Sequence, residues 1–564
     1  MGLTCINRGL GWPGRGPWVA LAALFLAALP EKTKFQGQAA ATTGEVVQAR
    51  SPAAEKPLHG SPVALHILPG SEVFTDRLIH EVRIEIKPES MEALRHAARD
   101  YVPATVHFGG ETFQDVALHL KGAAGSFRPL DDKPGLTLSF DRFRRGQLLH
   151  GLSKVHLNNS VEDPSYLTEE LGGELFRAAG IPAPRVAHAR VEINGRRLGL
   201  YVLIEGFTPE FLGGYFQRAD GNLYEPVSGH DIDRRMKRHF GAGTNDQSDL
   251  KALAAASLEP DPSRRWGRLS RVLDVDRFVT FMALEVMIGH RDGYCLAINN
   301  FRIYHDSDSD RMLFLPHGMD QLFGTANLPW RPHLAGLVAR AVIETPQGKE
   351  LYRQRFAYLL QERFDASTIA KRADEILADL RPQLHGLEFG EVSHEVEALK
   401  QRIRARAEDL RAQLGRPELG PLKFENEAAL LSGWSIMEPS GNARMDQTRT
   451  RDGKLALHIV SGRATSASWK TRMMLGRGHY RLEGKAMVEG VKPLPFGASQ
   501  GAGLRLSGHQ RREGRLIGTT SWKAVYDEFE ISQDNQTVEV VCELRASGGE
   551  AWFDLESLRI MKKN

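Results

Sequence analysis

The chain has 564 residues, which is too many for one ordinary domain and predicts about two to four domains. With 41% hydrophobic and 25% charged residues, its composition is that of a soluble globular protein. A formal net charge of +3 offers no large basic excess to neutralise phosphates, which argues against a nucleic-acid partner. Three cysteines, Cys5, Cys295 and Cys542, are too few for a disulfide framework, and we expect no structural disulfide.

The N-terminus has the pattern of an export signal. Arg8 and Arg15 precede an apolar run at residues 18–29, which suits the hydrophobic region of a signal peptide and is too short for a normal bilayer span. The alternative is an uncleaved membrane anchor. We expect a signal peptide and linker at 1–40, then a disordered linker at 41–71. The sequence therefore predicts an exported protein of the periplasm, cell envelope or extracellular space, with no transmembrane span beyond the signal segment.

The first part of the body is predicted to be a mostly antiparallel sheet with one inserted helix. Alternating apolar and polar residues predict strands at 80–86, 104–110, 116–121, 136–140 and in the two halves of 186–204. Asn194-Gly195 joins the last two runs and predicts a two-residue hairpin. Pro88 suits the first turn of a short helix between the first two strands.

The inserted helix is predicted to begin at Asp163, a suitable cap, and to end at Gly180. Glu174 lies on the same face as the apolar residues of this helix. An unpaired buried carboxylate is costly, so Glu174 needs a partner, and a Lys from a neighbouring strand is one candidate. Alternatively, Glu174 reaches solvent at the edge of the apolar stripe, and Glu169 is then the rival position.

Two features are weak candidates for binding phosphate. The small-residue loop Gly122-Ala-Ala-Gly-Ser126 follows a strand, so its backbone amides can approach a phosphate, or it is a plain turn. Lys133 lies just before the strand at 136–140. It either pairs with nucleotide phosphates or is a solvated loop lysine.

Residues 290–324 carry the chemistry around which the chain is organised. They predict a loop, a strand, a turn and a second strand. Asp292 precedes the first strand, Asn300 stands at its start, and Asp320 follows the second strand. Phosphoryl transfer needs such a set, because a carboxylate must orient or deprotonate the attacking hydroxyl and oxygen ligands must hold Mg²⁺ on the phosphates.

Helices flank this stretch on both sides. Residues 208–289 are predicted to be helices and loops, and residues 345–416 to be strongly helical. The chain thus has a β-rich part and a helical part, with the Asp-containing stretch between them. A nucleotide cleft is expected at that junction, because ligand sites favour such interfaces.

Together these residues resemble the CotH family, the spore-coat CotH-type atypical secreted protein kinases. The resemblance covers about residues 73–414. Its carriers are Leu118-His-Leu-Lys-Gly122, Lys133, Asp163-Pro-Ser-Tyr-Leu-Thr-Glu169, Gly180-Ile-Pro-Ala-Pro-Arg185, Ile193-Asn-Gly195, Gly199-Leu-Tyr-Val-Leu-Ile-Glu205, Gly221-Asn-Leu-Tyr224, Asn299-Asn-Phe301 and residues 316–324. The set is specific, although no single member is.

The resemblance implies an α+β fold with an atypical protein-kinase-like, two-lobed domain at residues 72–416. It implies transfer of the γ-phosphoryl group of ATP to Ser or Thr of a protein substrate, with Mg²⁺ or Mn²⁺. Asp292 is implied as the catalytic base, and Asn300 and Asp320 as the metal ligands.

The same resemblance implies three further cofactor-binding residues. Lys133 would pair with the ATP phosphates, Glu174 would form an ion pair with Lys133, and Glu205 falls where a hinge to the adenine would lie. The chain departs from the family pattern at the small-residue loop. Lys121 and Ala123 stand there in place of the Arg and Asn that the family often has, which leaves phosphate binding by this loop open.

Residues 420–564 are predicted to form a β-sandwich, because helical pattern stops and many short alternating runs follow. This part is similar to the galactose-binding-like jelly rolls of carbohydrate-binding modules. The similarity is carried by Phe424-Glu425, Gly433-Trp434 and Ala551-Trp-Phe-Asp-Leu555. It implies a structural Ca²⁺ at Glu425 and Asp554. Trp469 and Trp522 either stack on sugar or fill the core or an edge.

Three functions remain open at this point. The first is an active, exported ATP-dependent protein kinase with an unknown Ser- or Thr-containing substrate. The second is a catalytically silent protein that kept the fold and binds a glycan or a cell-surface ligand through its C-terminal domain. The third is a nucleotidyl transferase that adds AMP, which needs the same metal and Asp set.

Overall fold

The computed structural model describes residues 68–75, 79–123, 125–227, 229–243, 245–324, 326–416, 420–440, 442–462, 465–494, 500–507, 515–532 and 536–563. The predicted signal peptide at 1–40 and Cys5 lie outside these residues, as does the predicted linker at 41–71 up to residue 67. Within the described ranges, no helix is long and apolar enough to cross a bilayer. Cys295 and Cys542 are both buried free thiols.

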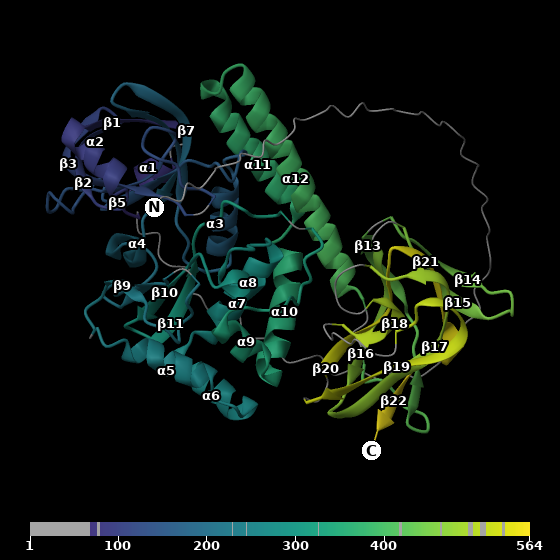
Figure 1. Ribbon diagram of the computed structural model, residues 1–564. Helices are drawn as coiled ribbons and strands as arrows, with labels where there is room; N and C mark the ends of the chain where they lie inside the picture. Colours follow the sequence, from purple (N-terminus) through teal and green to yellow (C-terminus); the bar gives the residue numbers. More distant parts are fainter. Residues whose placement is uncertain are drawn as a thin grey trace, which may run out of the picture. The chain divides into compact units, whose positions relative to one another are not determined.

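The first seven strands form a closed barrel in the order β1-β2-β3-β4-β5-β7-β6 (Figure 1). Their bounds are β1 (Ile79–Ile86), β2 (Val102–Phe108), β3 (Glu111–Lys121), β4 (Gly135–Ser139), β5 (Lys154–Asn158), β6 (Val186–Ile193) and β7 (Arg196–Glu205). All neighbours pair antiparallel except β1 and β6, which pair in parallel and close the ring. Alternate residues such as Val82, Ile84 and Ile86 fill the interior of the barrel.

The predicted hairpin at Asn194-Gly195 is confirmed. Asn194 has φ 47° and Gly195 has φ 81°, so both turn residues are left-handed. A two-residue turn of this kind matches the twist of the flanking strands, here β6 and β7. The predicted strands of this part are confirmed too, but β5 was missed and the sheet closes into a barrel.

Four helices accompany the barrel: α1 (Ser71–Thr75), α2 (Pro88–His96), α3 (Thr168–Ala178) and α4 (Pro209–Gly213). The helix predicted from Asp163 begins only at Thr168, and the prediction of its start was wrong. The Asp163 carboxylate accepts hydrogen bonds from the Ser165 and Thr168 backbone N–H groups, at 3.1 and 2.9 Å. These bonds hold residues 163–167 in a turn that leads into the helix.

A second sheet has the strand order β11-β10-β8-β9. Its strands are β8 (Leu223–Glu225), β9 (Lys237–Phe240), β10 (Phe301–Asp306) and β11 (Arg311–Pro316). The last two are the strands predicted within residues 290–324. Their register pairs Phe301 with Pro316, so Asn300 and His317 lie next to each other just beyond the hairpin's open end.

The helices that follow share one hydrophobic core, which also includes apolar residues of α3 and part of those of β10 and β11, while the short 3₁₀ helix among them has no buried residue. They are α5 (Ser248–Ser257), α6 (Pro262–Val272), α7 (Val275–Met287), α8 (Tyr294–Ala297), α9 (Leu337–Ile343), α10 (Pro346–Glu362), α11 (Ala366–Leu380), η1 (Arg381–Gln383) and α12 (Leu387–Leu414). Helices α11 and α12 lie side by side (Figure 1). The α+β fold class is therefore confirmed.

The C-terminal part consists of two antiparallel sheets around one core. One has the order β12-β22-β17-β21-β15-β14 with β19 on β17, and the other has the order β13-β16-β20-β18. The strands are β12 (Ala428–Leu430), β13 (Ser435–Ser440), β14 (Arg444–Arg449), β15 (Leu455–Val460), β16 (Thr465–Leu475), β17 (Gly478–Lys492), β18 (Gly501–Leu506), β19 (Gly518–Ile531), β20 (Gln536–Ala546), β21 (Gly548–Asp554) and β22 (Arg559–Lys563), with η2 (Leu555–Ser557) before β22. Trp469 belongs to the shared core, whereas Trp522 is partly exposed.

Candidate active site

The loop between α7 and β10 brings Asp292 and Asn300 into contact. The side-chain amides of Asn299 and Asn300 both donate to Oδ2 of Asp292, at 2.9 and 2.8 Å. Asn300 Nδ2 also lies 3.3 Å from the carbonyl oxygen of Gly318, which follows β11. Asp292 and Asn300 therefore lie side by side, next to the segment that leads to Asp320.

Tight backbone geometry makes these contacts possible. Asn300 and Gly318 are both left-handed, with φ 46° and 59°. A Cβ on Gly318 would lie 2.7 Å from Cγ of Asn300, so only glycine leaves room for the amide. Ile298 is also left-handed at φ 54°, which is uncommon for a β-branched residue. Such conformations persist where the surroundings hold them, and they concentrate at functional sites.

His290 connects this loop to the segment after β11. Its buried Nε2 donates to the Gly318 carbonyl at 3.0 Å, and its Nδ1 lies 3.5 Å from Oε1 of Glu285. Glu285, fully buried on α7, also accepts the backbone N–H groups of Tyr294 and Cys295, at 3.0 and 2.7 Å. Although burial opposes protonation, the contact with Glu285 raises the pKa of His290.

Asp320 faces the barrel. Asn158, at the end of β5, donates its side-chain amide to Oδ2 of Asp320 at 3.2 Å. The barrel strand thus orients a carboxylate carried by the loop after β11. Asn158 is a site residue that sequence reasoning missed, since an Asn at a strand end gives no specific signal.

Glu169 lies in the first turn of α3 and is only 4% exposed. Its Oε1 accepts the backbone N–H of Met319 at 3.0 Å, directly before Asp320. Burial and, next, the Asp320 charge raise the pKa of Glu169 to about 8, while Lys121 opposes this rise. Burial lowers the pKa of Lys121, at the end of β3, and the charges of Glu169 and Asp320 oppose that fall. Lys121, Glu169 and Asp320 therefore form one electrostatic group.

A further carboxylate, Glu162, lies near the same residues and was missed in the sequence. Partial burial and, next, the charge of Asp320 raise the pKa of Glu162, and Asp292 contributes in the same direction. The small-residue loop lies against it, because a Cβ on Gly125 would be 2.3 Å from Oε1 of Glu162. Within that loop, the Ala123 N–H already donates to Oγ of Ser126 at 3.1 Å. One backbone amide of the loop is thus already hydrogen-bonded within the loop itself.

The donor set fits a hard divalent cation that carries phosphate ligands. Among the described residues, no three His, Cys, Asp or Glu side chains are placed to hold an ion by themselves. Mg²⁺ does not require such a cage, because it usually keeps waters and binds through one or two protein carboxylates together with substrate phosphates. Asp320 and the side-chain oxygen of Asn300 are the groups that would hold it here.

A family model described as CotH kinase protein matches residues 118–410, which is more than half of the chain. The chain belongs to this CotH family. Invasin CotH2 of Rhizopus delemar is 22% identical over 353 residues, covering 56% of this chain and 58% of that protein. Inner spore coat protein H of Bacillus subtilis is 21% identical over 196 residues, covering 32% of this chain and 53% of that protein.

The chain spans about half the length of the curated relatives it matches, between 41% and 58%. Among solved structures, the Helicobacter pylori proinflammatory kinase CtkA aligns over 58% of this chain and 95% of its own, with 10% identity and a TM-score of 0.25. The structure titled "CBM4 structure and function" aligns over 23% of this chain and 86% of its own, with 18% identity and a TM-score of 0.17. TM-scores this low do not establish a shared fold.

The ion pair that the CotH resemblance implied between Lys133 and Glu174 does not form. Lys133 Nζ donates to the Tyr166 hydroxyl at 3.0 Å and lies 5.1 Å from the ring centroids of Tyr166 and Tyr201. Burial lowers its pKa to about 8. Glu174 instead accepts hydrogen bonds from both Nε and Nη2 of Arg372 of α11, with the closest contact at 2.8 Å. The correction has a simple cause: Glu174 faces α11, while Glu169 faces the candidate site.

Glu205 closes β7 with its carboxylate already paired. Arg185 donates to both of its oxygens, from Nη2 at 2.6 Å and from Nε at 2.9 Å, and Glu205 is 3% exposed. The Glu205 N–H donates to the Arg185 carbonyl at 2.9 Å. Its side chain therefore stabilises the end of the barrel strand, and Arg185 engages both of its oxygens.

In the C-terminal part, Glu425 and Asp554 do not fit a Ca²⁺ site as the structure places them. Oδ2 of Asp554 binds Nζ of Lys454 at 2.7 Å, and a second positive charge would compete with that lysine. Glu425 is exposed. Of the two tryptophans, Trp469 is 5% exposed and donates from Nε1 to the His458 carbonyl at 3.2 Å, as a core residue does. Trp522 donates to Asp452 at 2.8 Å.

Proposed function

We propose that this CotH protein is an exported atypical kinase of two-lobed, protein-kinase-like architecture that transfers the γ-phosphoryl group of ATP to Ser or Thr of a protein. The observation that supports this most directly is the contact of Asn299 and Asn300 with Asp292. Two amide donors hold one carboxylate in a fixed orientation beside the loop that carries Asp320. Positioning of this kind is most of what phosphoryl transfer requires from a protein.

Each residue has a role in this proposal. Asp292 accepts the proton of the attacking hydroxyl through Oδ1, because both amide partners bind Oδ2 and no described residue donates to Oδ1. Asp320 and Asn300 hold Mg²⁺ or Mn²⁺, which neutralises phosphate charge when bound. Lys121 replaces Lys133 as the lysine that pairs with the phosphates, and Glu169 replaces Glu174 as its partner. Lys121 is the better candidate because its charge already interacts with Asp320.

Transfer of label from γ-labelled ATP tests the proposal. The mature protein is incubated with ATP, Mg²⁺ or Mn²⁺ and a Ser-rich acceptor, beside Asp292→Ala and the control Asp310→Asn, whose side chain is 92% exposed in the β10–β11 turn. Label that persists in Asp310→Asn and disappears in Asp292→Ala supports the kinase. Label that survives in Asp292→Ala refutes the role of Asp292. Asp320→Ala is expected to abolish metal-dependent ATP binding in calorimetry, and retained affinity would remove Asp320 from the metal site.

Two alternatives keep a specific observation in their favour. The Ala123 N–H is already bonded to Ser126, so the small-residue loop offers fewer amides to a triphosphate than the kinase proposal would prefer. This favours either a silent binding protein or a different placement of ATP, as in AMP transfer. α-Labelled ATP separates the cases: label from the α-phosphate indicates nucleotidyl transfer, and no ATP binding at all indicates a silent protein.

We also propose a location for the protein and a binding role for its C-terminal domain. The export-signal pattern at residues 1–40 and relatives named as invasins and as a spore coat protein support a cell-surface or exported protein. For residues 420–564 we propose a jelly-roll domain that binds a glycan or a cell-surface ligand. The partly exposed Trp522 is the aromatic candidate for sugar stacking. A glycan array with the full chain and Trp522→Ala tests this, and equal binding by both proteins would exclude Trp522.

A further inference from the structure

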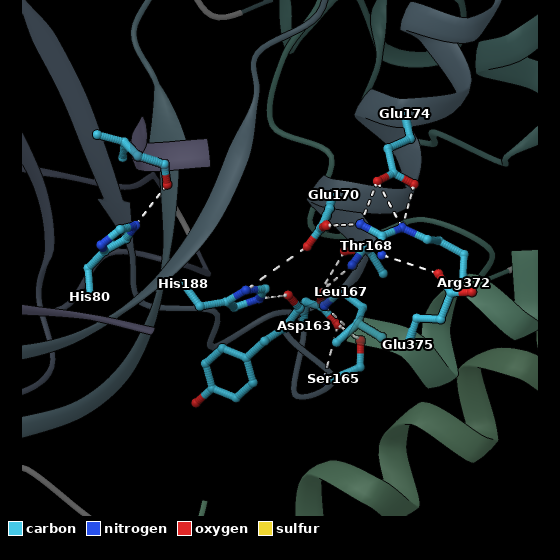
Figure 2. A network of polar contacts seen from close by, with 12 residues as sticks. His80, Asp163, Ser165, Leu167, Thr168, Glu170, Glu174, His188, Arg372 and Glu375 are labelled. Atoms are coloured by element: carbon cyan, nitrogen blue, oxygen red, sulfur yellow. Dashed lines mark hydrogen bonds and ion pairs between the residues drawn. The ribbon is translucent and has the colours of Figure 1, made fainter. Parts of the chain in front are cut away.

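Arg372 joins two helices that come from distant parts of the chain. From α11, its Nη2 reaches Oε1 of Glu170 at 2.7 Å and Oε1 of Glu174 at 2.8 Å, both on α3, as Figure 2 shows. Its Nε also donates to Glu174 at 3.0 Å, and its Nη1 lies 3.5 Å from Glu375 on its own helix. We call these four residues the Arg372 cluster. Its members range from largely buried to partly exposed, with Glu170 13%, Arg372 25%, Glu174 34% and Glu375 39% exposed.

Helix α3 carries this cluster on one face and the candidate site on another. Glu170 and Glu174 are four residues apart and share a face, whereas Glu169 is rotated by about 100° from Glu170. That rotation turns Glu169 toward the Met319 N–H and Asp320. Because α3 has only 11 residues, a shift or tilt of the helix would move Glu169 as well. The position of Glu169 therefore depends on the contacts that hold the face of α3 carrying Glu170 and Glu174.

The helix at the other end of the cluster is firmly fixed. Apolar residues of α11 lie in the helical core, and Asp374 of α11 binds Lys400 of α12 at 2.7 Å. Further along α12, the fully buried Arg406 donates to the carbonyls of Val286 and Met287, at 2.8 and 3.0 Å. These carbonyls end α7, just before the loop that carries Asp292. Helices α11 and α12 and the Asp292 loop thus form one framework.

The charges explain why Arg372 is needed at this contact. Glu170 and Glu174 repel each other at this spacing on a helix. Without Arg372, Glu174 would lose the hydrogen bonds that join it to α11, and Glu170 would keep only the longer contact with His188, at 4.0 Å. Removing Arg372 would therefore remove the hydrogen bonds that join α3 to α11 and loosen α3, without changing a residue of the candidate site.

We propose that Arg372 is a positioning residue, which holds α3 so that Glu169 keeps its hydrogen bond with the Met319 N–H, directly before Asp320. The inference rests on the proposed function, because it assigns Arg372 to the phosphate-binding side of that reaction. The inference goes beyond that function, because it names a residue of α11 that affects ATP binding without touching ATP. When α3 has moved, the protein binds MgATP less tightly, even if it is fully folded.

Steady-state kinetics of the full chain test the inference. Arg372→Ala is expected to raise KM for ATP and to lower kcat/KM by about 10- to 100-fold, since small misplacements of positioning groups have effects of this size. Lys371→Ala is the matched control, because Lys371 precedes Arg372 on α11, is 80% exposed and reaches the cluster only through a 4.0 Å contact with the partly exposed Glu375. A purely structural role would lower the active fraction and kcat while KM stays unchanged, and that result would overturn the inference.

Two further variants keep the test decisive if Arg372→Ala folds poorly. Arg372→Lys retains one charge, and the pair Glu174→Arg with Arg372→Glu restores an ion pair in reverse. Both are expected to return KM toward the wild-type value, and failure of the pair to do better than Arg372→Glu alone would overturn the inference. Hydrogen exchange gives a readout besides activity: amides of α3 should exchange faster in Arg372→Ala and not in Lys371→Ala.

The outcomes for inference and function are distinguishable. Wild-type protein that neither binds MgATP nor transfers label overturns the proposed function, and the inference falls with it. Active wild-type protein with unchanged KM and unchanged α3 exchange in Arg372→Ala overturns the inference alone.

Discussion

The backbone N–H of Met319 donates to the carboxylate of Glu169 at 3.0 Å. Through this bond, the first turn of α3 meets the residue directly before Asp320. Gly172 allows the close approach, because a Cβ there would lie 2.6 Å from Cδ1 of Leu322 and 3.0 Å from Sδ of Met319. The helix beside the barrel and the loop after β11 are thus joined by a polar contact and by direct packing.

We predict different effects on ATP binding for substitutions of Lys121 and of Lys133. Lys121→Met is expected to weaken MgATP affinity at least about tenfold in calorimetry, because it removes a cation whose charge interacts with Glu169 and Asp320. Lys133→Met is expected to lower thermal stability more than affinity, because Lys133 lies between the rings of Tyr166 and Tyr201. The reverse pattern would restore Lys133 to the phosphate site.

Gly318→Ala tests the close approach at the candidate site. The new Cβ would meet Asn300 at 2.7 Å and displace the amide from Asp292, so transfer activity is expected to be lost. The left-handed backbone at residue 318 adds a cost of about 1–2 kcal/mol. Gly109→Ala is the control, because Gly109 has φ 58° and no neighbour within 4 Å. Equal activity losses in the two variants would mean that backbone strain, and not the Asn300 contact, is responsible.

The raised pKa of Glu170 predicts how the stability of the folded protein depends on pH. Burial and, next, the Glu174 charge raise the pKa of Glu170 to about 7, and Arg372 opposes the rise. A raised carboxyl pKa means that the folded state holds more protons than the unfolded state, so this group's contribution to stability is lost as pH rises from about 4.5 to 7. In thermal unfolding from pH 5 to 8, Glu170→Gln should therefore gain stability relative to wild type as pH increases.

Two comparisons check that assignment. Glu362→Gln, at an exposed position on α10, should follow the wild-type curve at every pH. Arg372→Ala should steepen the loss of stability with rising pH, because it removes the charge that opposes the pKa rise of Glu170. A constant offset between Glu170→Gln and wild type across this range would exclude Glu170 as the titrating group.

Arg406 is expected to be one of the most sensitive positions for stability. Its guanidinium is fully buried and also donates to the carbonyl of Ala326 at 2.9 Å, in addition to the end of α7. Burial lowers its pKa to about 10. Arg406→Ala would remove hydrogen bonds from several buried carbonyls and leave a cavity, and we expect a loss of about 3 kcal/mol or more in urea unfolding. Arg404→Ala, at an exposed position of the same helix, should change stability by less than about 0.5 kcal/mol.

Local signals account for what could be predicted. Alternation gave the strands, because the side-chain period of a strand is visible within a few residues. The contact between Asp292 and Asn300 also follows from short-range structure, since both lie in the loop that enters a hairpin. The register of that hairpin, with Phe301 opposite Pro316, then places Asn300 beside the segment that leads to Asp320.

Long-range partners account for the errors. The helical wheel correctly showed that Glu174 needs a partner, but that partner is Arg372, which lies 198 residues away in sequence. Nothing in one helix identifies such a residue. Lys121 was seen only as a departure from the family pattern, because its neighbours Glu169 and Asp320 come from two other elements. Closure of the barrel was missed for the same reason, since alternation does not name the strand that pairs with β1.

The parallel pairing of β1 with β6 has a consequence for how the protein folds. Ile79 lies opposite His188, so β1 can pair with β6, its second neighbour, only when most of the barrel sequence is present. Contacts between residues so far apart form slowly, because a long loop must close first. Until then β1 and β6 each present an unpaired edge, which other chains can extend. Once the ring closes, no barrel strand offers such an edge, and the region is protected from aggregation by strand addition.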